Sequence, residues 1–408
     1  MSVDVREISL HDAVKFIVDN RGKTVPTADN GIPLIATNCI KNNGLFPVFE
    51  KIRFVSEETY KTWFRSHPEP GDIIFVNKGT PGRVCLVPNP VNFCIAQDMV
   101  ALRVDESVIY PKYLFAALRS DYIQNVIENM HVGTLIPHFK KSDFERLMIP
   151  VPDEVTQKYI GNLYYDLSMA IELNNQINKT LEEMAQAIFK SWFVDFEPFK
   201  NGEFEESELG LIPKGWRVAA LDEIATYLNG LAMQKYPPSK NERGLPVLKI
   251  KELRQGFTDG NSDICSESID NSYIINDGDI IFSWSGSLLV DIWCGGRCGL
   301  NQHLFKVTSA SYNKWFYYMW TRYHLERFIA IAKDKATTMG HIQRKHLSEA
   351  KVLIPEPNTL AFMDSVMQPI IDLVIANKVE NKTLSTIRDT LLPKLMTGEI
   401  RVPVEEVV

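Results

Sequence analysis

The 408-residue sequence repeats itself, and this repetition constrains its fold more than any other feature. Gly71-Asp-Ile-Ile-Phe75 returns as Gly278-Asp-Ile-Ile-Phe282, an offset of 278 − 71 = 207. Leu147-Met-Ile-Pro150 returns as Val352-Leu-Ile-Pro355, an offset of 352 − 147 = 205. Because the order is kept and the offset drifts by only a few residues, the sequence indicates a tandem duplication of a unit of about 200 residues.

Each copy of the unit has two parts. About the first 150 residues alternate short β-branched and aromatic runs with Gly, Pro and Asn clusters, which predicts strands with some helix. Tyr113–Arg119 and Trp315–Arg322 are the expected helices. Pro152-Asp153 and Pro357-Asn358 then place good N-cap residues before long helical patterns.

These patterns predict an α+β protein with two similar mixed α/β domains separated by two long antiparallel coiled-coil helices. The predicted boundaries are 1–152 for the first domain, 153–197 for the first long helix, 198–356 for the second domain and 357–408 for the second helix and tail. Pro369 predicts a kink or a late start in the second helix.

Both helices carry apolar residues at the alternating three- and four-residue spacing of a coiled-coil seam. In the first helix the seam is Ile160, Leu163, Leu167, Ala170, Asn174, Ile177, Leu181, Met184 and Ile188. Adding 203 gives Met363, Val366, Ile370, Leu373, Asn377, Glu380, Leu384, Ile387 and Leu391. The second seam is therefore apolar like the first, apart from Glu380.

Asn174 and Asn377 each occupy the fifth of nine seam positions. Two helices of a duplicated unit pair most simply about a pseudo-twofold axis, which makes them antiparallel and brings their midpoints together. We therefore predict that Asn174 and Asn377 lie close and hydrogen-bond, fixing the register of the helix pair. The alternative is that both are polar residues tolerated independently near solvent.

The formal net charge of −7 counts against a nucleic-acid binder, which usually carries a basic excess. Local clusters at Lys140-Lys141, Lys249-Ile-Lys251 and Arg344-Lys345 can still form a positive face, and partner subunits can supply some of the contacts to DNA.

Cys294-Gly-Gly-Arg-Cys298 lacks a second ligand pair, so small core residues are expected there rather than a zinc site. The N-terminus does not resemble a signal peptide and no uncharged apolar run reaches about 18–20 residues, so a cytoplasmic protein without a membrane partner is expected.

The whole chain resembles the specificity subunit of type I restriction–modification systems. The features that carry the resemblance are Gly-Asp-Ile-Ile-Phe followed by a Gly/Ser/Thr-rich loop, and the Ile-Pro-containing strand that opens each long helix. To these are added Ile212-Pro-Lys-Gly-Trp216, which starts the second domain, and Leu391-Leu-Pro-Lys-Leu-Met-Thr-Gly398, which closes the second helix.

The resemblance implies two target-recognition domains that read a bipartite asymmetric site on double-stranded DNA. It also implies docking of two methyltransferase subunits, with motor and nuclease subunits in the full complex. Methylation at adenine N6 with S-adenosylmethionine would belong to the partner, and this chain would bind no cofactor. Trp192-Phe-Val-Asp-Phe196 resembles the central conserved region where methyltransferase subunits dock.

The candidate DNA contacts follow the repeated strands or belong to basic clusters. The loop candidates are Lys78, Thr80 and Arg83 in the first copy and Ser283, Ser285 and Ser287 in the second. The others are Lys140 and Lys141, their counterparts Gln343, Arg344 and Lys345, and Lys249 with Lys251, expected on one face of a strand. For each group a solvated, purely structural role is an equal alternative. His138 and His341 recur in register, which packing or turn hydrogen bonding explains equally well.

A catalytic protein is the alternative hypothesis. An adenine methyltransferase needs an Asn- or Asp-Pro-Pro-aromatic loop, and the sole Pro-Pro, Pro237-Pro238, lies in an unsuitable context. The sequence has no Gly-x4-Gly-Lys-Ser/Thr phosphate loop and no metal-ligand spacing. A nuclease site made from scattered acids stays open. A purely structural coiled-coil scaffold would leave the duplicated domains unexplained.

Overall fold

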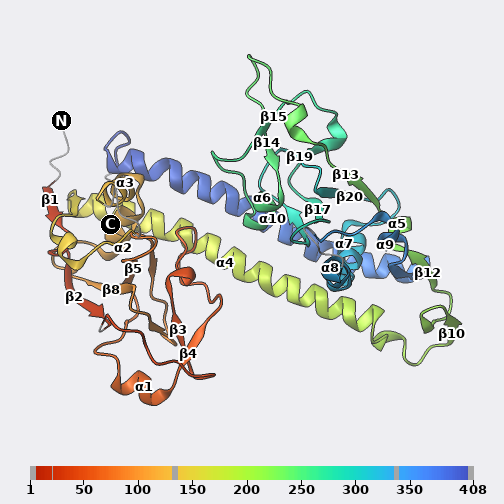
Figure 1. The fold of residues 1–408 in the computed structure, drawn as a ribbon, viewed down its shortest axis with the longest axis horizontal. Coiled ribbons are helices and arrows are strands. Elements are labelled where there is room, and N and C mark those ends of the chain that lie inside the picture. Colours follow the sequence, from red (N-terminus) through yellow and green to blue (C-terminus); the bar gives the residue numbers. More distant parts are fainter. Residues whose placement is uncertain (1–5, 21, 131–136, 335–339, 403–408) are drawn as a thin grey trace. The chain divides into compact units, whose positions relative to one another are not determined.

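The computed structural model describes residues 6–20, 22–130, 137–334 and 340–402, and divides the chain into two compact units (Figure 1). Unit 1 comprises Met1–Leu173 with Thr383–Val408, and unit 2 comprises Asn174–Lys382. The boundary between the units falls inside both long helices, so each unit contains one globular part and a part of each helix. The predicted division into two domains and two separate helices does not coincide with these units.

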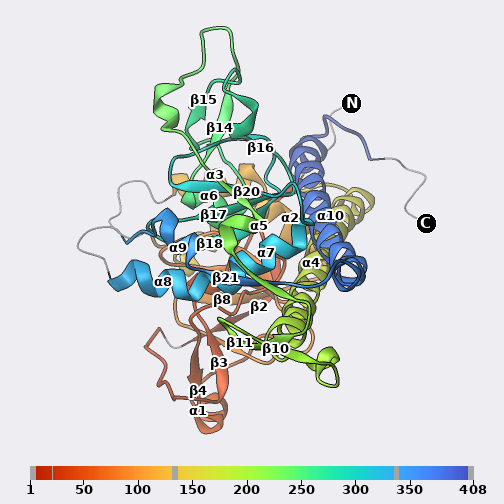
Figure 2. The ribbon, with the colours of Figure 1, turned by 90° about the vertical axis from the view of Figure 1, so that its right-hand side faces the viewer.

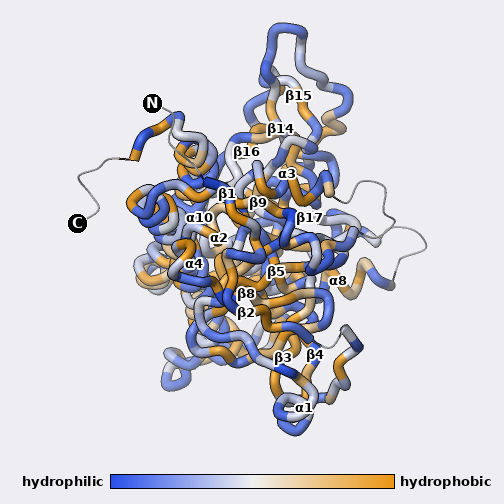
Figure 3. The backbone as a smooth tube through the Cα atoms, turned by 90° about the vertical axis from the view of Figure 1, so that its left-hand side faces the viewer, coloured by the Kyte–Doolittle hydropathy of each residue, from blue (hydrophilic) through white to orange (hydrophobic). Residues whose placement is uncertain are grey.

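Unit 1 is built on a four-stranded antiparallel sheet with the order β2-β8-β5-β6. Its strands are β2 (Val14–Asp19), β8 (Met99–Val104), β5 (Ile73–Val76) and β6 (Val84–Leu86). A second sheet has the order β4-β3-β7 and joins β4 (Arg53–Val55), β3 (Ile32–Ile35) and β7 (Cys94–Ile95). β1 (Arg6–Ser9) pairs with β9 (Met148–Val151), which leads to the first long helix. β5 and β9 belong to the hydrophobic segments of this unit (Figure 3).

The helices of unit 1 are short and several are capped by their own sequence. They are η1 (Thr37–Cys39), α1 (Glu57–Thr62), α2 (Pro111–Arg119), α3 (Asp121–Asn129) and η2 (Lys141–Glu145). Pro111 starts α2 at a position where a missing N–H costs nothing. Ser120 ends α2 and caps α3, because its Oγ accepts from the Ile123 amide at 3.3 Å. Buried residues of α2 and the sheet then form the main core of the unit.

Unit 2 repeats this architecture, with one additional strand in its second sheet. Its four-stranded sheet has the order β13-β20-β17-β18, made from β13 (Thr226–Asn229), β20 (Leu304–Thr308), β17 (Asp279–Ser283) and β18 (Leu289–Trp293). The second sheet has the order β15-β14-β19-β16, made from β15 (Ile264–Cys265), β14 (Leu245–Leu248), β19 (Cys298–Leu300) and β16 (Ile274–Ile275). β12 (Arg217–Ala220) pairs with β21 (Lys351–Ile354). The registers agree as well, since Phe75 faces Val100 in β8 and Phe282 faces Phe305 in β20. The predicted duplication is confirmed.

Unit 2 also contains a hairpin and several short helices. The hairpin joins β10 (Phe204–Ser207) to β11 (Gly210–Pro213). The helices are η3 (Glu197–Phe199), α5 (Leu221–Ile224), η4 (Met233–Lys235), α6 (Ile250–Gln255), η5 (Asn271–Tyr273), α7 (Lys314–Tyr323), α8 (Leu325–Asp334) and α9 (Arg344–Ser348). α5 packs against α7 and α9 (Figure 2).

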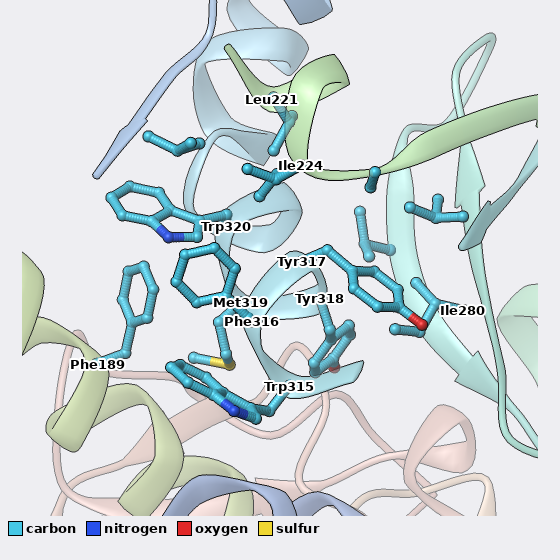
Figure 4. Packing of buried hydrophobic residues seen from close by; sticks show 14 of the residues in the cluster. Phe189, Leu221, Ile224, Ile280, Trp315, Phe316, Tyr317, Tyr318, Met319 and Trp320 are labelled. Atoms are coloured by element: carbon cyan, nitrogen blue, oxygen red, sulfur yellow. The ribbon is translucent and has the colours of Figure 1, made fainter. Parts of the chain in front are cut away.

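An aromatic cluster around α7 forms the core of unit 2 (Figure 4). Trp315 and Phe316 are completely buried, and the Trp320 ring meets Phe189 with 4.9 Å between centroids. Burial of one such side chain contributes about 1.5–3 kcal/mol. Phe189 belongs to the long helix α4, so the half of this helix in unit 2 is part of the core.

The two long helices each have 40 residues: α4 (Glu154–Phe193) and α10 (Pro357–Met396). Asp153 caps α4, because its Oδ1 accepts from the Thr156 amide at 2.9 Å. α10 begins at Pro357 and already includes Asn358, the expected N-cap residue; it continues through Pro369, so the predicted late start was wrong. Proline is tolerated at the first turn of a helix, and Pro357 occupies that place.

Most buried positions of both helices lie one position after the predicted seam, although the seam residues Ile160, Met363 and Asn377 are buried as well. The buried positions include Tyr164, Ser168, Ile171, Asn178, Ala185 and Phe189 in α4 and Met367, Ile371, Val374, Arg388 and Leu392 in α10. In contrast, Ile177 and Met184 are 45% and 47% exposed, and Leu373 and Ile387 are 45% and 40% exposed. Apolar residues cover a wide arc of each helix, so two adjacent stripes both follow the alternating three- and four-residue spacing. Packing against the rest of the protein decides which of the two stripes is buried.

By length and composition alone, α10 is also apolar enough to cross a membrane, with a mean hydropathy of 1.5 over its most apolar 18 residues. Only 22% of this window is buried, but Met363, Met367 and Ile371 of this helix belong to the core of unit 2. A packed core helix passes the same test, so this property is weak evidence for a membrane span.

We expect His324 to make the stability of unit 2 depend on pH. Burial lowers the pKa of His324 from 6.5 to about 4, although its Nε2 lies 2.8 Å from the Lys351 carbonyl oxygen. Because the unfolded state binds the proton more readily, the free energy of unfolding should fall by up to about 3 kcal/mol as the pH drops from about 6.5 to about 4. Tryptophan fluorescence can follow the unfolding of unit 2 at each pH, since six of the seven tryptophans lie within 174–382.

His324→Gln is the matched variant, because its side-chain amide can keep the bond to Lys351 without titrating. The pH dependence of unfolding should be shallower in this variant by the same amount. Identical slopes for the two proteins would show that His324 does not contribute.

Candidate nucleic-acid interface

One end of the four-stranded sheet of unit 1 brings together two of the predicted groups. The turn between β5 and β6 lies against the segment that precedes η2: Gly79 N donates to Pro137 O at 3.0 Å, and Phe139 N donates to Asn77 O at 2.7 Å. The buried Asn77 side chain adds a bond from Nδ2 to Phe139 O at 2.9 Å. Residues 77–83 and 137–141 together form what we call the turn face of unit 1.

Unit 2 has the same arrangement at the equivalent place. Gly286 N donates to Gly340 O at 2.9 Å, and Ile342 N donates to Trp284 O at 3.1 Å. Residues 284–288 and 340–345 form the turn face of unit 2. The backbone bridge between Lys78 and His138 has its counterpart between Ser285 and His341. The recurrence of the two histidines therefore coincides with a repeated backbone pairing.

The backbone of the β5–β6 turn requires glycine at two positions. Gly79 and Gly82 have φ values of 85° and 87°, which favour glycine. At Gly82 a Cβ atom would also come within 3.0 Å of Ile127 Cδ1. The turn is closed by the amide of Gly82, which donates to Val76 O at 3.0 Å.

The turn face of unit 1 presents positive charge. Lys78 and Lys140 are exposed, and Thr80 and Arg83 are half-buried. Within the described residues, the ammonium groups of Lys78 and Lys140 have no hydrogen-bond or ion-pair partner. Lys141 is different, because its Nζ pairs with Asp19 at the end of β2. Two free ammonium groups beside a glycine turn can bind phosphate oxygens.

The β17–β18 turn of unit 2 has an indole and hydroxyl groups where the β5–β6 turn of unit 1 has lysine, threonine and arginine. Ser283 is fully buried, and Ser285 is only 5% exposed, with its Oγ 3.0 Å from His303 Nδ1. This burial argues against direct contacts from Ser283 and Ser285 and leaves Ser287 as the exposed hydroxyl. Trp284 Nε1 donates to Asn229 Oδ1 at 2.9 Å, which fixes the indole at the end of β13.

The basic segment after this turn starts a helix. Gln343 caps α9, and Arg344 and Lys345 lie in its first turn; all three are exposed. The Arg344 guanidinium lies 5.9 Å from the centre of the Phe305 ring and donates to Tyr227 O at 3.4 Å. Arg344 is thus held at the sheet end, while Lys345 extends the charge along the turn face.

The prediction that Lys249 and Lys251 lie on a strand was wrong. β14 ends at Leu248, and Lys249 caps α6, where its amide donates to Glu252 Oε2 at 3.2 Å. This capping interaction favours the helix over the alternating strand pattern. Lys249 pairs with Asp263, and Lys251 lies 3.5 Å from Asp259. Sequence reasoning also missed Arg254, which follows Lys251 at the i+3 spacing of one helix face.

Asparagines cross-link the two long helices within unit 2, but not in the predicted pairing. Asn377 Nδ2 donates to Asn178 Oδ1 at 2.9 Å, and Asn174 Nδ2 donates to Asn381 Oδ1 and Glu380 Oε2, both at 3.0 Å. Because numbers rise on α4 as they fall on α10, the helices are antiparallel here. Adding 203 converts Asn174 to Asn377 and Asn178 to Asn381, so the duplication relates one hydrogen-bonded pair to the other. The pseudo-twofold axis between the helices therefore passes between two equivalent contacts, and not through a single contact as predicted.

The described residues contain no group of three or more His, Cys, Asp or Glu side chains placed to hold a metal ion. All six cysteines are buried thiols. Burial raises the pKa of Cys85 to about 12, which keeps this thiol protonated.

Comparison with known proteins gives a consistent result. Residues 3–183 and 213–387 match the family described as the type I restriction modification DNA specificity domain. The chain is 29% identical over 385 residues to the type I restriction enzyme MjaIX specificity subunit of Methanocaldococcus jannaschii, covering 91% of this chain and 87% of that protein. It is 22% identical over 406 residues to the HindI specificity subunit of Haemophilus influenzae, covering 81% and 86%.

Among solved structures, a type I restriction-modification S subunit from M. genitalium matches over 96% of both chains. The TM-score is 0.52 and the sequence identity is 16%, so this likeness concerns the fold alone.

The asparagine cross-links predict an asymmetric response to mutation. Asn178→Ala should lower the free energy of unfolding of unit 2 by about 1–3 kcal/mol, because it leaves the buried Asn377 amide without its acceptor. Denaturant unfolding followed by tryptophan fluorescence measures this loss. Asn175→Ala is the control: its Oδ1 accepts from Asn381 Nδ2 at 2.9 Å, but this hydrogen bond is exposed, so its loss should cost only about 0.5 kcal/mol. Equal effects of the two substitutions would contradict a structural role for the buried pair.

Proposed function

The chain belongs to the type I restriction modification DNA specificity family, and we propose that it is the DNA-reading subunit of such a complex, with each unit contacting one half of a bipartite site. The observation that carries this proposal is the repeated turn face. The same backbone contacts join the sheet end to the segment before the long helix in both units. The exposed side chains on this support differ, as two unlike half-sites require.

The long helices are suited to set the distance between the half-sites. At 1.5 Å per residue, a helix of 40 residues is about 60 Å long, and one DNA turn is about 34–36 Å. Exposed apolar side chains such as Ile177, Met184 and Leu373 offer docking positions for methyltransferase subunits. Trp192 and Phe193 are less suited to docking than the sequence suggested, because both are buried in the core of unit 2.

In this proposal the chain itself is not catalytic. Two methyltransferase subunits would bind S-adenosylmethionine and transfer its methyl group to adenine N6, and motor and nuclease subunits would complete a cytoplasmic complex. Duplication of the family domain over both halves of the chain supports this assignment over a stand-alone methyltransferase or nuclease.

Purification with and without the methyltransferase subunits of its own system tests this assignment. We expect no methylation of a genomic DNA library by the chain alone and a two-part adenine-methylation motif for the complex. The motif can be determined by single-molecule sequencing of the treated library. Methylation or cleavage by the chain alone would refute the proposed role.

The free lysines of unit 1 predict a sequence-independent contribution to binding. Lys78→Ala and Lys140→Ala should each weaken DNA binding equally for all sequences and reduce the slope of log K against log salt by about 1. Binding by the complex at several salt concentrations measures the slope. Lys61→Ala is the matched control, because Lys61 is an exposed lysine that already pairs with Glu57 at 3.4 Å. A salt slope unchanged by either turn-face substitution would exclude phosphate contacts there.

A further inference from the structure

A surface depression of about 370 Å³ adjoins the turn face of unit 2. It is lined by Ile250, Lys251, Arg254 and Gln255 of α6 and by Ser287 of the β17–β18 turn. α6 packs against β14 and β18 (Figure 2). A Cβ atom at Gly286 would lie 3.7 Å from Ile250 Cδ1. The depression therefore joins two segments that sequence analysis treated as separate DNA-contact candidates.

The polar groups around this depression are unequally engaged. Lys251 Nζ lies 3.5 Å from Asp259 Oδ2, and Gln255 Nε2 donates to Phe257 O at 2.5 Å. Across the part of the chain that the structure describes, the exposed Arg254 guanidinium has neither a hydrogen-bond nor an ion-pair partner. Ser287 uses its carbonyl oxygen, which accepts from Ser283 Oγ at 2.9 Å, and leaves its hydroxyl exposed. The Arg254 guanidinium and the Ser287 hydroxyl are thus available for a ligand, whereas the neighbouring Lys251 and Gln255 side chains already have partners.

The helix that carries Arg254 is fixed on both sides. Glu252 is 3% exposed and caps the helix start, while Leu253 is 1% exposed in the core beneath. Gly256 ends the helix with a φ of 84°. An arginine on such a support loses less conformational freedom on binding than one on a mobile loop.

The equivalent position in unit 1 has different chemistry. β3 and β14 correspond, since Ile35 pairs in parallel with Ile95 of β7 and Leu248 pairs in parallel with Leu300 of β19. Counting onward with the same offset, Lys41 takes the place of Arg254, although η1 ends at Cys39 whereas α6 continues to Gln255. Lys41 Nζ lies 3.2 Å from Glu50 Oε2, so its charge is already paired. The free cation at this place is therefore particular to unit 2.

We propose that Arg254 determines specificity by recognising a guanine in the half-site contacted by unit 2, with Ser287 as a neighbouring polar contact. This inference rests on the proposed function. The planar guanidinium presents paired donors that match guanine O6 and N7, the commonest base-specific contact to this base. Lys251 pairs with Asp259 and Lys249 pairs with Asp263. Arg254 is therefore the cation of this segment that can contact a base edge without first breaking an ion pair.

The test is the methylation motif of complexes assembled with wild-type chain, Arg254→Ala and Arg254→Gln. We expect both substitutions to lower the preference for guanine at one position of one half-motif by about 10- to 100-fold. All positions of the other half-motif should stay as in the wild type, which also shows that each variant chain is folded and assembled. Lys41→Ala is the matched control and should leave the motif unchanged.

Two results would overturn the inference. Either Arg254→Ala leaves every base preference unchanged, or it weakens methylation of all sites equally, as loss of a phosphate contact does. A wild-type complex that gives no motif at all would instead refute the proposed function.

Discussion

Packing of the long helices into the globular parts is the interaction on which each unit depends. In unit 1, Leu392 and Leu395 from α10 are buried with Tyr113 and Phe115 of α2, more than 270 positions earlier in the chain (392 − 115 = 277). In unit 2, Phe189 and Phe193 from α4 fill the core around Trp320. A helix that forms part of a core cannot rotate independently of that core. The helices are thus structural components of both units, and the apolar stripe they bury is chosen by these cores.

This dependence explains which features the sequence could predict. Repeated motifs such as Gly71-Asp-Ile-Ile-Phe75 and Gly278-Asp-Ile-Ile-Phe282 were sufficient for the duplication, because equivalent strands need the same apolar faces. The start of α4 was predictable from its cap Asp153, whose effect is local, whereas α10 starts at Pro357, before the expected cap Asn358. The buried stripe was misplaced by one position because local spacing does not reveal which neighbouring residues a distant core will cover.

The error at Lys249 and Lys251 has a different origin. Alternation of lysine and isoleucine over three residues fits a strand, but Glu252 and Gly256 supply the two ends of a short helix. An alternation over three residues is too short to outweigh the capping residues of a helix. Because the segment is helical, Lys251 and Arg254 lie on the same helix face.

The prediction that Asn174 pairs with Asn377 failed for a geometric reason. A twofold axis can pass between two equivalent contacts as readily as through one, and the seam spacing does not distinguish these cases.

The two turn faces show how a duplicated fold diverges at constant backbone geometry. Both keep the hydrogen bonds that join the strand end to the segment before the long helix, yet Lys78 of unit 1 corresponds to Ser285 of unit 2. Backbone bonds do not depend on the side chain, so these positions can change without loss of the support.

The difference between local charge and net charge resolves the apparent conflict between a net charge of −7 and a DNA-binding role. Many cations are neutralised by nearby acids, including Lys61, Lys158 and Lys190. Lys78, Lys140 and Arg254 are not paired in this way within the described residues. Since salt screens interactions beyond about 10 Å, a DNA backbone responds to these free cations and their neighbours more than to the sum over the whole chain.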